Sequence, residues 1–156
     1  MIQRIQSIYL LIAAGLMTLA AFFPLVDFYL IDADAIVGRL NAFSWQYGSN
    51  DEWQNITTLY SLGIAIVVTA LLNLTIIFLF SKRKLQVKLT HYAFILKIAI
   101  IAVLVYFVCI MQGDDVASTK PQLGCLFVVL AMVFDWLAVK AIRKDEALVR
   151  SIDRIR

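Results

Sequence analysis

Three polar side chains interrupt apolar segments of the chain, and they have the greatest capacity for chemistry. Lys97, Asp135 and Asn73 each lie eight or nine residues from a basic residue flanking their segment. At a rise of about 1.5 Å per residue, an ammonium, a carboxylate and an amide would reach similar depths on three helices. Such a cluster could relay protons, conduct an ion or bind a polar ligand, so it is our candidate intramembrane site.

Two structural interpretations compete with that functional one. A lone charge in a spanning helix costs about 2.5–3.5 kcal/mol, so Lys97 and Asp135 could pair with each other, with Asn73 as a hydrogen-bonding neighbour. Alternatively, Lys97 extends to the interface and Asp135 pairs with Arg4 or Lys140. We favour the structural pair, because a single neutral ion pair without a second carboxylate offers few ionisable groups for a transport site.

Four apolar segments would position these residues, at 5–25, 58–80, 89–112 and 122–142. Each meets the length of about 20 residues that crosses a bilayer as a helix, and a lone strand in lipid would leave its backbone unpaired. The chain is 62% hydrophobic, against about 45–50% for soluble domains. We therefore predict an all-α membrane protein, a four-transmembrane-helix bundle forming a single integral-membrane domain over residues 1–156.

Charge is sorted between the connections. One side carries eleven Lys or Arg and three acidic residues, a net +8, while residues 26–57 and 113–121 carry two basic and seven acidic residues, a net −5. The positive-inside rule then predicts both termini in the cytoplasm and a multi-pass protein of a bacterial inner membrane. The predicted partner is the lipid bilayer, because its anionic headgroups suit the basic patches. We do not expect a nucleic acid to bind.

The first segment could be a signal peptide, but it is longer than the usual apolar region of one, and we expect a retained helix.

The outer connection, residues 26–57, is rich in β-branched and aromatic residues. Two extended runs, Val26–Ile31 and Ile36–Tyr47, predict a short β-hairpin-like element or two-stranded sheet, with a turn at 48–51. Trp45, Trp53 and Tyr60 could lie against the membrane interface. We interpret this element as a lid over the bundle, or as a docking surface for a protein partner.

The two other connections are shorter. We predict a turn at residues 113–121 and a short basic loop at residues 81–88.

The tail, residues 143–156, lacks Gly and Pro and is rich in helix formers. It predicts either a cytoplasmic extension of the fourth helix or an amphipathic helix on the membrane surface. It could also hold a protein partner. The charged residues that would form this interaction are Arg143, Lys144, Asp145, Glu146, Arg150, Asp153 and Arg154.

Small residues recur every three or four positions on two helices and predict their inward faces. On the fourth helix this stripe is Gly124, Val128, Ala131, Asp135 and Ala138, and on the first it is Ser7, Ala14, Thr18 and Ala21.

The remaining reactive side chains are a histidine and two cysteines. His91 has no Cys, His or Glu at ligand spacing, so no metal or other cofactor is predicted, and we expect an interfacial polar residue. Cys109 and Cys125 each lie four residues inside their helix from the outer connection. A disulfide between them is one interpretation, and two small packing residues, which we favour, are the other.

Three stretches of the sequence resemble a known family: Met1–Leu10, Lys82–Gln86 and, most specifically, Ala141–Arg156. The family is an uncharacterised domain-of-unknown-function family of small four-span inner-membrane proteins from Bacteroidetes-type bacteria. The resemblance implies an inner-membrane location and four spans. It implies no activity, cofactor or catalytic residue.

The sequence contains no nucleophile–base pair, metal cluster or phosphate-binding loop, so we do not expect an enzyme. The leading hypothesis is a non-enzymatic accessory, scaffold or assembly protein. The alternative is a small transporter or an ion- or proton-conducting protein that uses Lys97, Asp135 and Asn73, with an enzyme acting on a lipid third.

Overall fold

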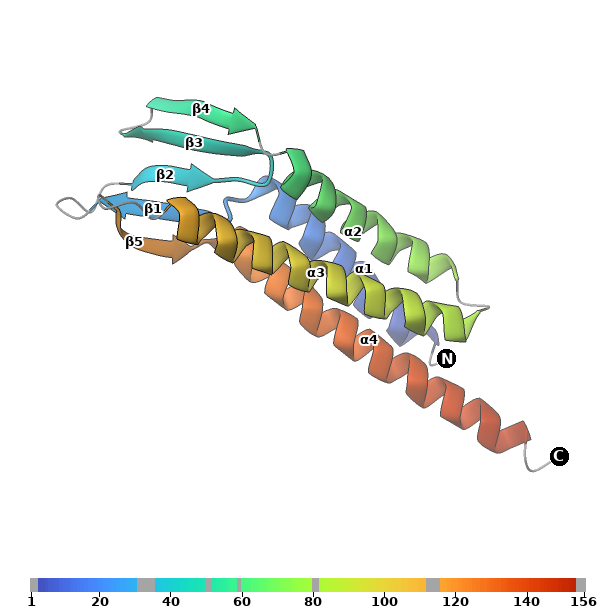
Figure 1. Ribbon diagram of the computed structural model, residues 1–156. Coiled ribbons are helices and arrows are strands. Elements are labelled where there is room, and N and C mark those ends of the chain that lie inside the picture. Colours follow the sequence, from blue (N-terminus) through green and yellow to red (C-terminus); the bar gives the residue numbers. More distant parts are fainter. Residues whose placement is uncertain are drawn as a thin grey trace.

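The computed structural model describes residues 3–30, 36–49, 52–58, 60–79, 82–111 and 116–153. Within them the chain forms four helices, α1 (Gln3–Phe22), α2 (Tyr60–Phe78), α3 (Arg83–Met111) and α4 (Leu123–Asp153), and a five-stranded sheet. The helices lie side by side, and the sheet covers one end of the bundle (Figure 1). We call this the sheet end. The opposite end, where α1 begins and α4 ends, is the basic end, because Lys82, Lys84, Lys88, Lys140, Arg143 and Lys144 lie there.

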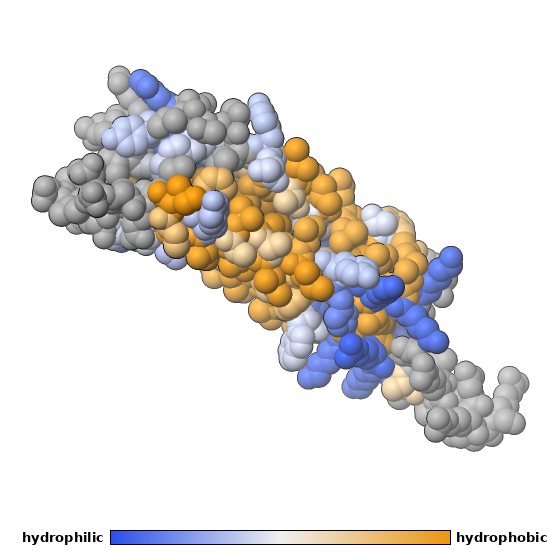
Figure 2. Space-filling view, viewed as in Figure 1, coloured by the Kyte–Doolittle hydropathy of each residue, from blue (hydrophilic) through white to orange (hydrophobic). Residues whose placement is uncertain are grey.

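All four predicted apolar segments are helices long and apolar enough to cross a membrane, at Ile5–Phe22, Tyr60–Phe78, Lys84–Ile110 and Leu123–Asp145. In the bundle α1 packs against α2 and α4, and α3 packs against the same two helices. Apolar side chains cover its middle (Figure 2). The predicted four-helix membrane bundle is confirmed.

The sheet is larger than the predicted hairpin. Four strands lie between α1 and α2, namely β1 (Val26–Leu30), β2 (Ile36–Leu40), β3 (Ser44–Ser49) and β4 (Glu52–Thr58). A fifth, β5 (Val116–Pro121), lies between α3 and α4, and the order is β4-β3-β2-β1-β5 with antiparallel neighbours. Two predictions were therefore wrong. The run Ile36–Tyr47 is two strands joined by a turn, and residues 113–121 include a strand rather than only a turn, because the edge of β1 is there to pair with.

One face of the sheet packs onto the helices. Val26, Phe28, Leu40 and Trp45 share a single apolar core with residues of all four helices. The rings of Phe28 and Trp45 meet edge to face, with centroids 4.8 Å apart. Trp45 was expected at the membrane interface, but it is buried, since the sheet closes the bundle over it. The sheet is thus part of the same folded unit as the spans.

The expected basic loop 81–88 is mostly helix. α3 begins at Arg83, and its approach is tight, since the Lys82 amide donates to the Leu79 carbonyl and the Gln86 amide to the Lys82 carbonyl, each at 3.0 Å. The helix-forming residues of this segment suit the first turns of a helix better than a loop. The positive charge of the segment therefore lies on the end of α3.

The predicted inward face was correct for α4, whereas on α1 only Ala14 of the predicted stripe is buried. On α4, Gly124, Val128, Ala131, Asp135 and Ala138 are all buried. On α1, Thr18 is exposed, and Ser7 and Ala21 are only half-buried. The buried face of α1 is rotated by about one residue and consists of Gln6, Leu10, Ala13, Ala14, Met17 and Ala20. Small size alone did not identify this face, because larger side chains fill the space toward α4.

The tail extends α4. The helix is continuous from Leu123 to Asp153, past Asp145, where its apolar stretch ends. In Figure 1 this part projects beyond the basic end of the bundle. Of the two predicted arrangements, the structure adopts the extension rather than a separate surface helix.

Gly124 allows α4 to begin against the chain that leaves α1. Its amide donates to the Pro24 carbonyl at 2.9 Å, and the Gln122 amide donates to the Leu25 carbonyl at 3.0 Å. A Cβ at Gly124 would lie 2.7 Å from the carbonyl oxygens of Phe23 and Pro24. These are backbone atoms, so a larger residue would push the two segments apart.

We predict that Gly124→Ala lowers the free energy of unfolding by about 1–3 kcal/mol, the usual cost of overpacking. The matched control is Gly15→Ala in α1, where a Cβ meets nothing within 4 Å. Thermal unfolding in detergent micelles measures both. Equal midpoints for the two variants would contradict the close contact inferred at Gly124.

Candidate functional site

Lys97 of α3 and Asp135 of α4 form an ion pair inside the bundle. The Lys97 Nζ donates to the Asp135 Oδ2 at 2.5 Å, and both side chains are 0% exposed. Lys97 therefore does not extend to the interface. Of the two other partners proposed for Asp135, Lys140 lies instead over the Trp136 ring, 5.3 Å from its centroid. The side chain of Arg4 lies outside the described part of the structure. The structure thus makes the pair that the sequence analysis favoured.

Asn73 of α2 does not join this pair. It is fully buried, yet neither atom of its amide group has a hydrogen-bond partner among the described residues. The second carboxylate oxygen of Asp135, Oδ1, is likewise without one. The predicted three-residue cluster is therefore an ion pair and a separate amide. Spacing along a helix gives depth and approximate face, but not whether two side chains on different helices meet.

A small pocket lies beside Asp135, between α3 and α4 toward the basic end. It has a volume of about 100 Å³ and is lined by His91, Phe94, Asp135, Trp136 and Val139. His91 is exposed, as an interfacial residue should be. The sequence analysis did not connect His91 with Asp135, although Lys97 lies on the same helix within two turns of His91.

Hydrogen bonds orient the His91 ring. Its Nδ1 lies 2.8 Å from the Val87 carbonyl, which can only accept, so Nδ1 carries a proton. In the neutral ring Nε2 is then the acceptor, and the Arg143 guanidinium reaches it at 3.4 Å. This contact joins the first turns of α3 to the end of the α4 span. Among the described residues, no three His, Cys, Asp or Glu side chains gather in a way that could hold a metal ion.

Asp145 belongs to the bundle rather than to a free tail. Its side chain is buried, and its Oδ2 accepts a hydrogen bond from the Gln6 Nε2 of α1 at 3.2 Å. The prediction that Asp145 faces a partner was therefore wrong, because the α4 stripe that contains Asp135 and Ala138 continues to this position. Arg143 and Lys144 are exposed. The other predicted tail side chains, those of Glu146, Arg150, Asp153 and Arg154, lie outside the described part of the structure.

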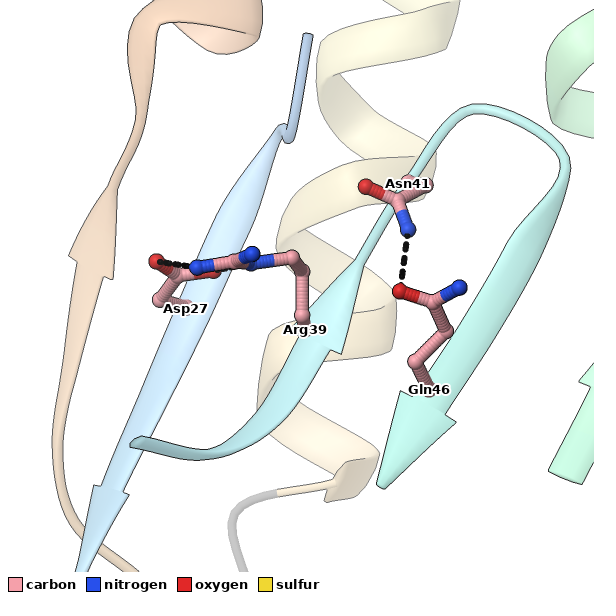
Figure 3. A network of polar contacts seen from close by, with 4 residues as sticks. All are labelled: Asp27, Arg39, Asn41 and Gln46. Atoms are coloured by element: carbon pink, nitrogen blue, oxygen red, sulfur yellow. Dashed lines mark hydrogen bonds and ion pairs between the residues drawn. The ribbon is translucent and has the colours of Figure 1, made fainter. Parts of the chain in front are cut away.

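The outward face of the sheet carries polar residues that the sequence analysis did not select. Strand pairing places Lys120, Asp27, Arg39 and Gln46 in one row across β5, β1, β2 and β3. Arg39 donates from Nε and Nη2 to the two carboxylate oxygens of Asp27, at 3.0 and 3.4 Å (Figure 3). The available signal was alternation, since Asp27 and Arg39 each lie between apolar residues in sequence.

Two further contacts support this row. The Asn41 Nδ2 donates to the Gln46 Oε1 at 2.9 Å, across the turn between β2 and β3 (Figure 3). Lys120 lies over the ring of Tyr29, with 4.3 Å between its Nζ and the ring centroid. Asp27 is only 2% exposed, whereas Lys120 is exposed. Among the side chains that the structure describes, this face therefore presents cations and amides, and the Asp27 carboxylate is covered.

The two cysteines are free thiols in this structure. Cys109 is exposed on α3, and Cys125 is half-buried near the start of α4. The disulfide considered from the sequence is not formed. The exposure of Cys109 shows that it faces away from the helix contacts.

These features define a class of protein: a four-span membrane protein with a buried ion pair and a small antiparallel sheet at one end. The chain belongs to the family DUF4293, a domain of unknown function, which matches residues 2–155. A search of curated proteins found no match.

We predict that Lys97→Met and Asp135→Leu each lower the free energy of unfolding by about 3–5 kcal/mol, because each leaves one buried charge without its partner. The double variant should regain most of that loss, since an apolar replacement of a buried pair is often neutral or stabilising. Chemical unfolding in detergent micelles measures the three values. Lys88→Met, an exposed position on the same helix, is the control. Additive losses in the double variant would show that the two charges do not interact.

Proposed function

We propose that this protein is a non-enzymatic accessory, scaffold or assembly protein of a bacterial inner membrane, with its basic end in the cytoplasm. The sorting of Lys and Arg to one side of the four spans supports this orientation. The resemblance to small inner-membrane proteins described above supports the location. The protein would then present its sheet outside the cytoplasm and the extension of α4 inside it.

The observation that carries the proposal is that ordered structure projects from both ends of the spans. The sheet shares its core with all four helices. At the other end α4 continues from Asp145 to Asp153, about 12 Å at 1.5 Å per residue. The sheet packs onto the bundle and the extension continues α4 beyond it, an arrangement that suits a protein positioning partners on either side of a membrane.

The chemistry within the membrane supports the same proposal. Lys97 and Asp135 neutralise each other and have no exposed surface. A pair of this kind fixes the register of α3 against α4, and its burial leaves little scope for an ion to enter and leave. A function in the parts outside the bilayer therefore fits the described structure better than a reaction inside it.

We predict that removing residues 148–156 reduces the recovery of a cytoplasmic partner protein in crosslinking pulldowns from the native cell. Truncation at this point keeps Asp145 and its hydrogen bond with Gln6, so the bundle should remain intact. The matched control replaces residues 148–156 with a neutral helix-forming segment of the same length. This control distinguishes the effect of losing the charges from the effect of shortening the helix. Identical sets of recovered proteins from the full chain and the truncation would overturn partner binding by the tail.

One observation favours the alternative, a small transporter or an ion- or proton-conducting protein. Asn73 is a fully buried amide without a protein partner among the described residues, and such groups in membrane helices commonly serve a ligand or ion. Leaving a buried polar group unpaired costs about 1–3 kcal/mol, so the amide lowers stability unless it serves some purpose.

We predict that Asn73→Val raises the free energy of unfolding by about 1 kcal/mol or more and leaves liposome permeability unchanged. Permeability is measured as proton flux reported by an entrapped pH-sensitive dye under an imposed membrane potential. For an accessory protein, liposomes with the wild-type chain should match protein-free liposomes. A wild-type flux that Asn73→Val abolishes would support the transporter and contradict our first proposal.

A further inference from the structure

An open apolar groove runs between α3 and α4 on the side of the bundle that faces lipid. Its volume is about 520 Å³, and its lining residues are Phe94, Ile101, Val129, Met132, Val133 and Trp136. Phe94 and Trp136 also line the pocket beside Asp135 and His91, so the groove continues into that pocket toward the basic end. An apolar groove of this kind suits a hydrocarbon chain.

Cations gather where this groove reaches the basic end. The Lys140 Nζ lies over the ring of Trp136, and the Arg143 guanidinium contacts His91, so both cations belong to the residues around the groove. Lys140 and Arg143 are exposed. Among the described residues, neither has a carboxylate within ion-pair distance, since Asp135 pairs with Lys97 and Asp145 bonds with Gln6. Figure 2 shows hydrophilic side chains beside the apolar surface at this end.

The separation of the apolar and cationic parts matches one leaflet of a bilayer. Val133 and Arg143 are ten residues apart on α4, about 15 Å at 1.5 Å per residue. Half of a hydrocarbon core of about 30 Å is the same length. A lipid with a chain in the groove would therefore place its headgroup beside Lys140 and Arg143.

We propose that this groove, with Lys140, Arg143 and His91 at its end, is a binding site for an anionic phospholipid of the leaflet at the basic end. One acyl chain would lie along Phe94, Val133 and Trp136. The headgroup phosphate would accept hydrogen bonds from Arg143, whose planar guanidinium matches a phosphate, and would neutralise Lys140.

A second copy of this chain is a poorer occupant of the groove. In a two-fold dimer with both copies in the same orientation, the same patch meets itself across the interface. The groove residues at the basic end, Lys140 and Arg143, would then approach their own copies, and like charges across an interface are unfavourable. An anionic lipid supplies the opposite charge.

Native mass spectrometry of the full chain in detergent, titrated with phosphatidylglycerol or phosphatidylcholine of identical acyl chains, tests the proposal. We expect wild-type protein to bind phosphatidylglycerol more tightly. Each cation near a lipid surface contributes about fivefold, so Lys140→Gln with Arg143→Gln should weaken phosphatidylglycerol binding by about 25-fold. Phosphatidylcholine binding should fall by less, because the choline cation already compensates the charge of its phosphate. Val133→Trp, which fills the groove at an exposed position, should weaken binding of both lipids.

The matched control is Lys82→Gln with Lys120→Gln, which removes two exposed positive charges away from the groove. It should retain the wild-type preference. An equal loss in this control would overturn the proposal, because general charge attraction would then explain the binding. Equal affinity of the wild-type chain for the two lipids would overturn it too, as would a lipid-free dimer that Val133→Trp dissociates.

Discussion

A lysine and an aspartate in hydrocarbon are tolerated only together, and the pairing of Lys97 with Asp135 constrains the whole bundle. Rotating or sliding either helix by one residue would separate the two charges and leave each without a partner. The pair therefore fixes the register of α3 against α4. The same face of α4 carries Gly124 against the chain leaving α1 and Asp145 against Gln6. One helix face thus determines the contacts of α4 from the sheet end to the basic end.

The sheet joins the two halves of the bundle. Strands β1 to β4 come from the connection between α1 and α2, whereas β5 comes from the connection between α3 and α4 and pairs with β1. Backbone hydrogen bonds between β1 and β5 therefore hold the two helical hairpins at a fixed spacing. Phe28 and Trp45 pack against the helix ends, and Asp27 and Arg39 form their ion pair on the opposite face.

The surfaces outside the spans differ in chemistry. The sheet presents a row of cations and amides on a rigid platform, while the basic end combines lysines and arginines with an apolar groove that leads into the membrane. The first surface suits polar contacts with a protein, and the second suits an anionic lipid. The buried pair lies between them, away from both surfaces.

The sequence by itself determined four spans, the inward face of α4 and the opportunity for Lys97 and Asp135 to pair. Apolar length and helical spacing are properties of one segment, and the cost of a buried charge is large enough to predict a partner. The tertiary structure decided the fifth strand, the rotated face of α1, the burial of Asp145 and the separation of Asn73 from the pair. These features depend on contacts between residues distant in sequence, where the space left by one element selects the side chain or strand that fills it.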